Sequence, residues 1–326
     1  MVQNLCSENL EKLVISYRRG MLDEKILPPI LVIELTNQCN IDCIMCPTKY
    51  NRTNGYMDFK LYVKIINQAK NALKAIQLYF RGEPLLHPNL IEMVEYAKEN
   101  TNARVILSTN ATLLTKELSE KIIKSKLDDI VFSIDGDTKH TYEKIKIGAN
   151  YDNVIENVRD FITLKNKMKG NINIIIKLIQ LYLNETEIEA FERKWKKLGC
   201  DVEISWFNTW ANQISDYNNF SDKFNPNLAN SRLPCADLWF KCVVTYDGKV
   251  VLCCYDFKAR GIVGDIKKQK LSEIWNGEKI GLLRNLHIKG TFGKIHLCQN
   301  CMEWSQEDDE YIYFPEFNFK GMGGRP

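Results

Sequence analysis

Six short β-rich runs alternate with helical periods between residues 30 and about 207, and this alternation constrains the fold more than any other feature. The predicted strands are Ile30–Leu35, Ala75–Phe80, Arg104–Ser108, Asp129–Ile134, Asn171–Ile179 and Asp201–Trp206. Helical patterns lie at residues 58–73, 89–99, 115–125, 151–168 and 185–198. Successive β/α units with right-handed crossovers form a parallel sheet with helices outside it, which curls toward a barrel. The sequence predicts an α/β fold, a partial (β/α)6 TIM-like barrel that is open on one side.

Three cysteines, Cys39, Cys43 and Cys46, follow the first predicted strand at the spacing C-x3-C-x2-C. They lie on the loop that leaves the C-terminal end of that strand, where β/α barrels collect their functional groups. Three thiolates can hold three irons of a [4Fe–4S] cube and leave the fourth iron open, whereas a cube that only transfers electrons normally has four thiolates. A zinc site would need a fourth nearby ligand, and His87 and Cys200 are remote along the chain.

The spacing of these cysteines resembles the signature of the radical S-adenosylmethionine (radical SAM) superfamily. The resemblance implies that Cys39, Cys43 and Cys46 bind a [4Fe–4S] cluster and that the methionine end of SAM chelates its open iron. One electron then cleaves SAM to a 5′-deoxyadenosyl radical in this family. Met45 stands where the family usually has an aromatic side chain and supplies similar apolar bulk.

The segment Phe80-Arg-Gly-Glu-Pro84 after the second predicted strand resembles the Gly-Gly-Glu-Pro segment of the same family. The resemblance implies that Gly82 lets the backbone approach SAM closely. It also implies that Glu83 receives the methionyl ammonium in a charge-assisted hydrogen bond. Arg81 replaces the first glycine of the family segment.

Three more polar residues lie near the ends of later predicted strands. Ser133 and Asp135, at i and i+2 on one face of a strand, resemble positions with which the family contacts SAM or substrate. The alternative is a turn in which Asp135 or Asp137 caps the next helix. Lys177 interrupts an apolar run and needs an anionic partner there. The SAM carboxylate is one such partner, and the alternative is a lysine that reaches solvent from an edge strand.

Composition limits the compartment and the partners. The 44 basic and 41 acidic residues leave a net charge of +3, which argues against a dedicated nucleic-acid surface. The sequence has neither a signal peptide at its N-terminus nor an apolar stretch of about 18 residues that could span a membrane. We therefore expect a cytoplasmic protein, in whose reducing surroundings the eleven cysteines are metal or cluster ligands rather than disulfides.

A second set of cysteines occupies the C-terminal third of the chain. Asp247-Gly248 between alternating apolar positions predicts a β-hairpin, which brings Cys253 close to the strand after Cys235. Cys298-x2-Cys301 can complete the site from a distant loop. Four thiolates make either a zinc site or a fully ligated [4Fe–4S] cube, and the spacing alone does not separate them.

The pattern Cys235-x12-Gly248-x4-Cys253 with a distant Cys298-x2-Cys301 resembles the auxiliary-cluster domain of SPASM/twitch radical SAM enzymes. The resemblance implies that Cys235, Cys253, Cys298 and Cys301 hold a second, auxiliary [4Fe–4S] cluster. Since no cysteine follows Cys301, we expect a shortened, twitch-type domain with one cluster.

Two cysteines of the C-terminal third, Cys242 and Cys254, remain outside this pattern. Either can substitute as a cluster ligand, or pack as a small apolar side chain. The third possibility is a catalytic role as the hydrogen-atom donor beside the substrate.

These assignments divide the chain into five predicted segments. They are a helical lead-in that covers one end of the barrel (1–29), the radical SAM core (30–212), a linker (213–232), the auxiliary domain (233–305) and a C-terminal tail (306–326).

The resemblance implies a radical SAM oxidoreductase that acts on a small-molecule or peptide substrate. It also implies an electron donor such as flavodoxin or ferredoxin. From the composition we expect no nucleic-acid or membrane partner. We expect two-electron dehydrogenation of a sugar or aminocyclitol alcohol, with the auxiliary cluster as the second electron's acceptor. The alternatives are a sugar epimerase that uses a cysteine as hydrogen donor, a SPASM enzyme that modifies a ribosomal peptide, and a non-catalytic zinc or electron-transfer protein.

Overall fold

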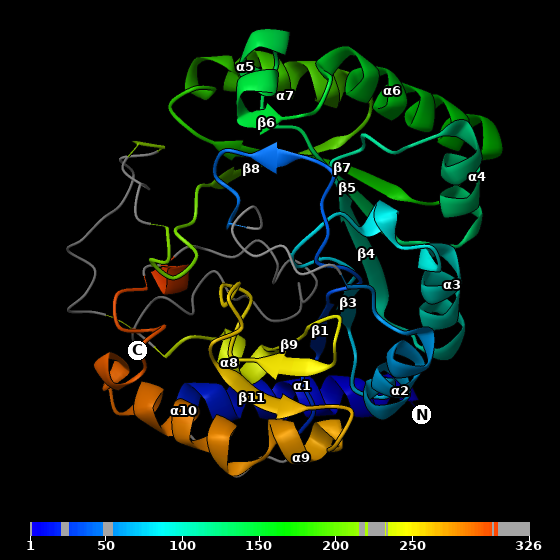
Figure 1. Cartoon of the computed structure of the whole chain (residues 1–326). Helices are drawn as coiled ribbons and strands as arrows, with labels where there is room; N and C mark the ends of the chain where they lie inside the picture. The colour runs from blue at the N-terminus through cyan, green and yellow to red at the C-terminus, as the bar shows by residue number, and fades with distance from the viewer. Residues whose placement is uncertain are drawn as a thin grey trace.

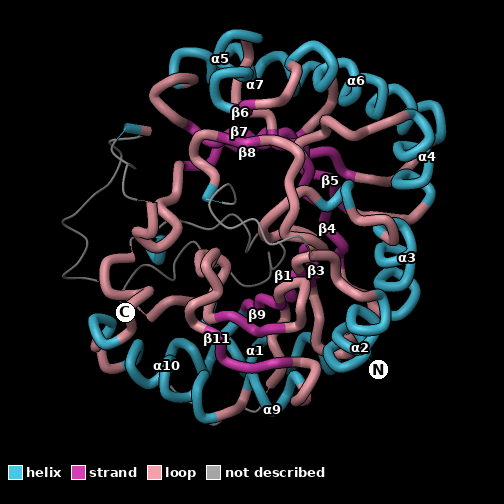
Figure 2. The backbone as a smooth tube through the Cα atoms, viewed as in Figure 1, coloured by secondary structure: helices cyan, strands magenta, loops and turns pink. Residues whose placement is uncertain are grey.

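The computed structural model describes residues 2–20, 26–47, 55–214, 219–220, 232, 234–301 and 303–305. Its strands form a curved inner layer with helices along the outer side (Figures 1 and 2). The α-helices are α1 (Val2–Arg19), α2 (Phe59–Ala69), α3 (Leu90–Asn100), α4 (Lys116–Lys124), α5 (Lys139–Ile145), α6 (Tyr151–Met168), α7 (Ile188–Lys197), α8 (Asp237–Phe240), α9 (Leu271–Trp275) and α10 (Glu278–Ile288). The strands are β1 (Ile30–Ile33), β2 (Asp42–Cys43), β3 (Ala75–Gln77), β4 (Arg104–Thr109), β5 (Asp129–Ser133), β6 (Lys146–Ile147), β7 (Asn173–Gln180), β8 (Asp201–Trp206), β9 (Lys241–Val244), β10 (Lys249–Val251) and β11 (Ile262–Asp265).

A nine-stranded sheet with the order β11-β10-β9-β1-β3-β4-β5-β7-β8 is the frame of the molecule. From β1 to β8 every neighbouring pair is parallel, and this part of the order follows the chain. The strands β8 and β11 end the order, so the sheet is an arc rather than a closed barrel in the described residues (Figure 2). The predicted partial (β/α)6 barrel is confirmed.

The cysteine-rich C-terminal part of the chain extends this same sheet. Strand β9 runs parallel to β1, with Ile30 opposite Lys241 and Ile33 opposite Val244. The chain then turns at Gly248, where φ is +85°, and β10 pairs antiparallel with β9 and β11. The hairpin predicted around this glycine is confirmed by that pairing. Glycine suits the turn because a residue without Cβ adopts such a φ at low cost.

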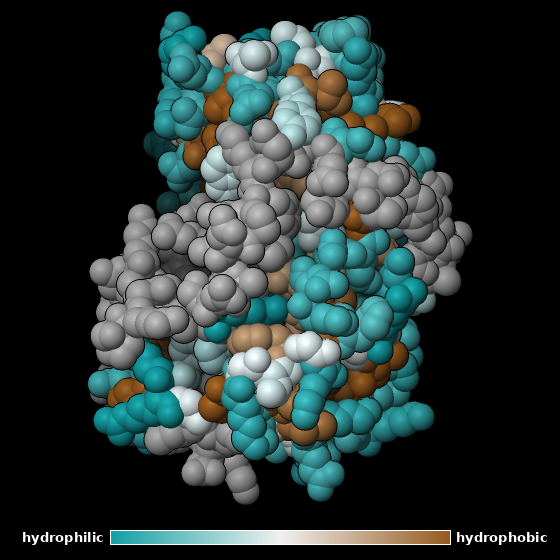
Figure 3. Space-filling model, turned by 90° about the vertical axis from the view of Figure 1, so that its left-hand side faces the viewer, coloured by the Kyte–Doolittle hydropathy of each residue, from teal (hydrophilic) through white to brown (hydrophobic). Residues whose placement is uncertain are grey.

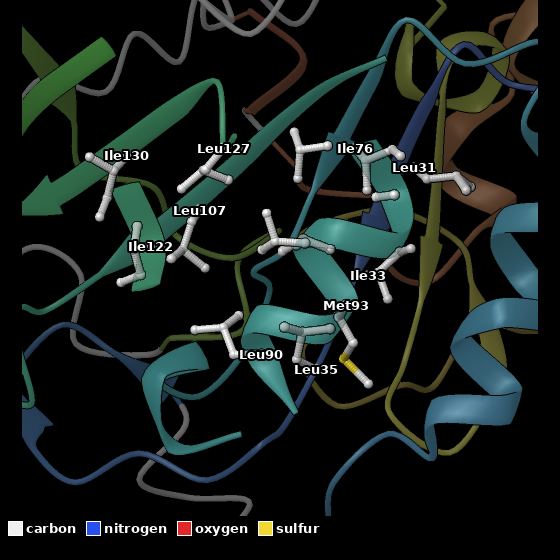
Figure 4. Packing of buried hydrophobic residues seen from close by; sticks show 14 of the residues in the cluster. Leu31, Ile33, Leu35, Ile76, Leu90, Met93, Leu107, Ile122, Leu127 and Ile130 are labelled. Atoms are coloured by element: carbon white, nitrogen blue, oxygen red, sulfur yellow. The ribbon is translucent and has the colours of Figure 1, made fainter. Parts of the chain in front are cut away.

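The main hydrophobic core lies between the sheet and the outer helices. Fully buried side chains of the strands, such as Leu31, Ile76 and Leu107, pack against Met93 of α3 and Ile122 of α4, as Figure 4 shows. Each such side chain contributes about 1.5–3 kcal/mol when it leaves water. Alternation along each strand leaves the other set of side chains pointing into the barrel.

Helix α1 covers the end of the barrel at which the parallel strands begin. Its Leu10, Leu13 and Val14 are buried in a second cluster that includes Ile30 of β1 and Ala75 of β3. Helix α1 thus lies within the segment where the lead-in helix was predicted. None of the described helices combines the length and the apolar character that a bilayer crossing requires.

Strands β2 and β6 and helix α5 are elements of the barrel domain that were not predicted. Strands β2 and β6 form a small antiparallel ladder in which Cys43 lies opposite Lys146. Helix α5 leads directly into β6, and its N-cap is Thr138, whose side chain accepts a hydrogen bond from the Thr141 amide. The helix-capping alternative for Asp135 and Asp137 is therefore wrong.

A buried ion pair joins the barrel to the C-terminal hairpin. Glu34, directly after β1, accepts hydrogen bonds from Arg81 Nε at 2.5 Å and Nη2 at 2.8 Å. The backbone amide of Tyr246 also donates to the carboxylate of Glu34, at 3.0 Å. Arg81 Nη1 donates to the carbonyl of Phe257 at 2.7 Å. Arg81, which departs from the family segment, thus ties three parts of the chain together.

Replacing Arg81 by methionine leaves the Glu34 carboxylate buried without its cation. We expect R81M to lower the free energy of unfolding by about 3 kcal/mol. The double variant E34Q/R81M should recover most of that loss, because it removes the buried charge as well. Anaerobic urea unfolding of the three proteins checks this, and an unchanged R81M midpoint would contradict it.

Candidate active site and auxiliary metal centre

Cys39, Cys43 and Cys46 lie on the loop after β1, as predicted from their spacing. Burial raises the pKa of Cys39 to about 11 and that of Cys43 to about 12, and the charge of Cys46 adds to both increases. This mutual effect means that the three thiols lie within electrostatic reach of one another. A bound cation or cluster would replace the protons of these thiols, because the thiolate is the ligand.

Gly82 packs against the chain just before this cysteine loop. Its φ is +76°, and a Cβ there would lie 2.5 Å from the carbonyl oxygens of Thr36 and Gln38. The next amide, of Glu83, donates to the Gln38 carbonyl at 2.7 Å. The absence of a side chain at Gly82 therefore lets its segment contact the cysteine loop. The predicted approach of SAM to Gly82 stays a prediction.

The carboxylate of Glu83 connects this loop to the end of β4. It accepts from the Leu85 amide at 3.0 Å, from Thr109 Oγ1 at 2.7 Å and from the Asn110 amide at 2.7 Å. Asn110 in turn places its Nδ2 3.9 Å from Cys39 Sγ. Burial raises the pKa of Glu83, and the three hydrogen bonds oppose that rise. A carboxylate has about four acceptor positions, so one remains for the ammonium that we predict.

Ser133 and Asp135 meet a lysine that the sequence analysis missed. Lys146 Nζ lies 2.8 Å from Asp135 Oδ2 and donates to Ser133 Oγ at 2.7 Å. Burial lowers the pKa of Lys146, but the charges of Asp135 and Cys43 outweigh burial and hold it above its usual value. A permanent positive charge therefore lies beside the ladder position of Cys43. In the sequence, Lys146 stands two residues before Gly148, in a segment without a helical or strand period that could have predicted its position.

Lys177 has its anionic partner within the protein. Its Nζ lies 2.5 Å from Glu203 Oε1 on the neighbouring strand β8, and Ser205 Oγ donates to the same oxygen at 2.7 Å. Since β7 lies between β5 and β8, the edge-strand alternative is wrong. The predicted contact of Lys177 with the SAM carboxylate stays a prediction.

The four cysteines predicted to hold the auxiliary cluster line one cavity of about 60 Å³. They are Cys235, Cys253, Cys298 and Cys301. Burial raises the pKa of Cys298 to about 11. Burial also raises the pKa of Cys253, and the charges of the other three cysteines raise it further. The fold thus brings together four thiols that are up to 66 residues apart in the sequence.

Neighbouring polar groups position two of these cysteines. The Cys235 amide donates to His287 Nδ1 at 3.1 Å, and Cys301 Sγ donates to Glu303 Oε2 at 3.1 Å. Glu303 also accepts from the amide and the hydroxyl of Thr209, at 2.6 and 2.7 Å. The carboxylate of Glu303 therefore links the auxiliary site to the segment that leaves β8.

Both cysteine groups fit iron–sulfur clusters in the chemistry of their donors. In the described ranges no three His, Cys, Asp or Glu side chains converge as ligands of a single metal ion do. The thiolates of a [4Fe–4S] cube bind separate irons, and the four thiols of the second group line one cavity. That each named cysteine is a ligand stays a prediction.

The two remaining cysteines have different surroundings. Cys242 is 1% exposed and belongs to the core between sheet and helices, where burial raises its pKa to about 12. The proposed catalytic role of Cys242 is therefore wrong, and it packs as a small apolar side chain. Cys254 is half-buried and packs against the cluster of Val32, Val243 and Val251.

Two family models match this chain. The model of the radical SAM superfamily matches residues 33–191, and that of the SPASM iron–sulfur cluster-binding domain matches residues 235–302. Together they span well over half of the sequence. The protein is a radical SAM enzyme with a C-terminal SPASM domain. A radical SAM domain implies SAM and a [4Fe–4S] cluster, and a SPASM domain implies further iron–sulfur clusters.

Individual proteins resemble the chain over most of its length. The S-adenosyl-L-methionine-dependent 2-deoxy-scyllo-inosamine dehydrogenase of Niallia circulans is 24% identical over 290 residues, which are 87% of this chain and 97% of the relative. The structure of BtrN in complex with AdoMet and 2-DOIA superposes with a TM-score of 0.58 at 23% identity, and covers 85% of this chain and 93% of BtrN. Streptococcus suis SuiB bound to its precursor peptide SuiA gives a TM-score of 0.63 at 15% identity, over 83% and 69% of the two chains. These two structures share the fold of this protein.

Replacing Lys146 by methionine tests whether its charge serves the first cysteine group. We expect K146M to form 5′-deoxyadenosine from SAM at least about tenfold more slowly, because Asp135 is left as a buried, unpaired anion beside Cys43. The exposed Lys144 provides the matched control K144M, which should match the wild type. The assay uses anaerobically reconstituted protein with dithionite, and wild-type cleavage by K146M would contradict this role.

Proposed function

We propose that this enzyme oxidises a secondary alcohol of a sugar or aminocyclitol to a ketone. Support comes from the similarity to the Niallia circulans dehydrogenase over nearly the whole of both chains. The four-cysteine cavity adds to it, because an auxiliary cluster with four thiolates has no open iron for substrate and is suited to electron transfer. An electron donor such as flavodoxin or ferredoxin, in a reducing cytoplasm, completes the proposal.

The observation that carries the proposal is the position of two adjacent cysteines. Cys253 lines the auxiliary cavity, while Cys254 packs against the inward-pointing Val32 and Val243 of the barrel. A residue at the interior of the barrel and a residue that lines the auxiliary cavity are therefore direct neighbours in the sequence. A substrate held in the barrel lies next to the group that would take its second electron.

When bound, SAM and the first cluster supply the 5′-deoxyadenosyl radical that takes hydrogen from a C–H bond, and the auxiliary cluster supplies an electron acceptor. The chain's own contribution is to hold the substrate, exclude water and accept a proton. Cys254 Sγ lies 3.3 Å from Asp237 Oδ2, and Asp237 Oδ1 lies 3.2 Å from Lys241 Nζ. This thiol–carboxylate–ammonium group, in which Asp237 and Lys241 are buried, is our candidate for the acceptor of the hydroxyl proton.

The same group favours epimerisation as the second candidate function. A thiol at the inner face of the barrel can return a hydrogen atom to a substrate radical from the opposite side. Among the described cysteines outside the two predicted ligand sets, Cys254 is the one at the inner face of the barrel. In that case the substrate carbon is inverted and the auxiliary site gains no electron.

Replacing Cys298 by alanine separates SAM cleavage from substrate oxidation. We expect C298A to retain uncoupled formation of 5′-deoxyadenosine within about threefold of wild type and to lose ketone formation by at least about a hundredfold. Replacing Cys43 by alanine should abolish both. Undiminished ketone formation by C298A would remove the auxiliary site from the mechanism, and cleavage of SAM by C43A would remove the first site.

A reaction in D2O distinguishes the two candidate functions, with 2-deoxy-scyllo-inosamine as the probe substrate. Dehydrogenation yields a ketone that carries no solvent deuterium at the oxidised carbon, and C254A then keeps part of the activity. Mass spectrometry of the product gives the answer. An alcohol product with one deuterium, which C254A no longer forms, would establish epimerisation in place of our proposal.

A further inference from the structure

A groove of about 670 Å³ lies along β11 and α10 and crosses the Cys298–Cys301 loop, on the outside of the auxiliary site. Its apolar lining includes Leu252, Leu286 and Leu297. Two further apolar side chains in the lining, Ile262 and Leu282, are 42% and 58% exposed. Exposure of large aliphatic side chains beside a groove is typical of a surface that binds a partner. Figure 3 shows the molecule from the side on which α10 lies in Figure 1, and apolar surface there lies among hydrophilic side chains.

The charged side chains of this groove have a single sign. Arg260, Lys279 and Lys294 are exposed basic residues of its lining, which also holds His296 and contains neither Asp nor Glu. None of the three forms an ion pair with another residue in the described part of the chain. For a protein whose net charge is only +3, this is a local concentration of positive charge with no ion-pair partner among the residues that the structure describes. A groove of this kind attracts an acidic partner.

The groove shares a wall with the auxiliary cavity. Ala211, Leu252 and Leu297 line both, and the two leucines directly precede Cys253 and Cys298 in the sequence. The groove is also lined by Gln299 and Asn300, the two residues between Cys298 and Cys301. A partner in the groove is therefore separated from the auxiliary thiols by one layer of side chains.

We propose that this groove docks an acidic, one-electron carrier protein of the ferredoxin class, which removes the electron that the auxiliary cluster receives. The inference rests on the proposed function, since dehydrogenation reduces that cluster by one electron in each turnover. The step itself forms and breaks no bond, because one electron leaves the reduced cluster and reduces the oxidised ferredoxin. Interfaces between redox partners are small and steered by charge, which suits an apolar floor with a basic rim.

The test measures electron transfer without the organic substrate. The reconstituted full-length enzyme is reduced, and its reoxidation by an acidic [2Fe–2S] ferredoxin is followed by stopped-flow absorbance. We expect the triple variant R260E/K279E/K294E to lower the second-order rate constant at low ionic strength at least about tenfold. The difference should shrink at high salt, where surface charges are screened.

The matched control reverses the same number of charges elsewhere. Lys116, Lys124 and Lys167 are exposed residues of α4 and α6, which lie on the far side of the molecule from α10 (Figure 1). The variant K116E/K124E/K167E should stay within about twofold of wild type. Both variants should react equally with a small uncharged quinone, which needs no docking. Equal losses in the two variants, or a wild-type rate that salt leaves unchanged, would overturn the proposal.

Other occupants give distinct results. A further variant replaces the acidic run Glu307-Asp308-Asp309-Glu310 by the corresponding glutamines and asparagines. If this variant is reoxidised severalfold faster than the wild type, the chain's own C-terminal segment occupies the groove, and the proposal fails. A dimer that sedimentation detects in the wild type and that the groove variant loses would identify a second copy instead. An auxiliary site without iron would overturn the proposed function, and titration of the labelled ferredoxin by NMR would then decide the docking separately.

Discussion

The parallel pairing of β1 on both of its edges is the constraint on which the rest of the structure depends. All four residues of β1 are buried, with β3 on one side and β9 on the other. The carboxyl ends of parallel strands meet at one edge of a sheet, so the loop with Cys39, the loop with Glu83 and the start of the auxiliary hairpin converge there. Strand β10 then runs antiparallel to β9 and leads from this edge back to Cys253, which packs in the cluster that contains Leu13 of α1.

Buried charges then fix the loops at that edge. The Glu34–Arg81 pair holds the barrel against the hairpin, and the Asp135–Lys146 pair holds the β2–β6 ladder beside Cys43. Each of these pairs would be costly to break, because one partner would remain as an isolated charge in the interior. They give the loops a single arrangement, which a site that must direct a reactive radical to one C–H bond requires.

The barrel could be predicted from the sequence because its strands and helices have strong periodic patterns. The bounds expected for α6 and β8 agree with the structure.

The ladder of β2 with β6 was missed because two residues are too few for a period, and Lys146 was missed with it. The addition of β9 to the barrel sheet is a long-range pairing that no local pattern encodes. Cys242 was misread as a catalytic candidate because its burial follows from that same pairing. The predictions for most of the linker and for the tail after Ser305 concern residues outside the described ones.

Iron, acid-labile sulfide and zinc per chain, determined on the anaerobically reconstituted wild type, test the central claim most directly. That claim is that the two cysteine groups hold two iron–sulfur clusters and that the second is an electron acceptor. Our account predicts about eight irons and eight sulfides with no zinc, as expected for two [4Fe–4S] cubes. About four irons with one zinc would contradict it, because the C-terminal site would then be structural and the oxidation would have no internal acceptor.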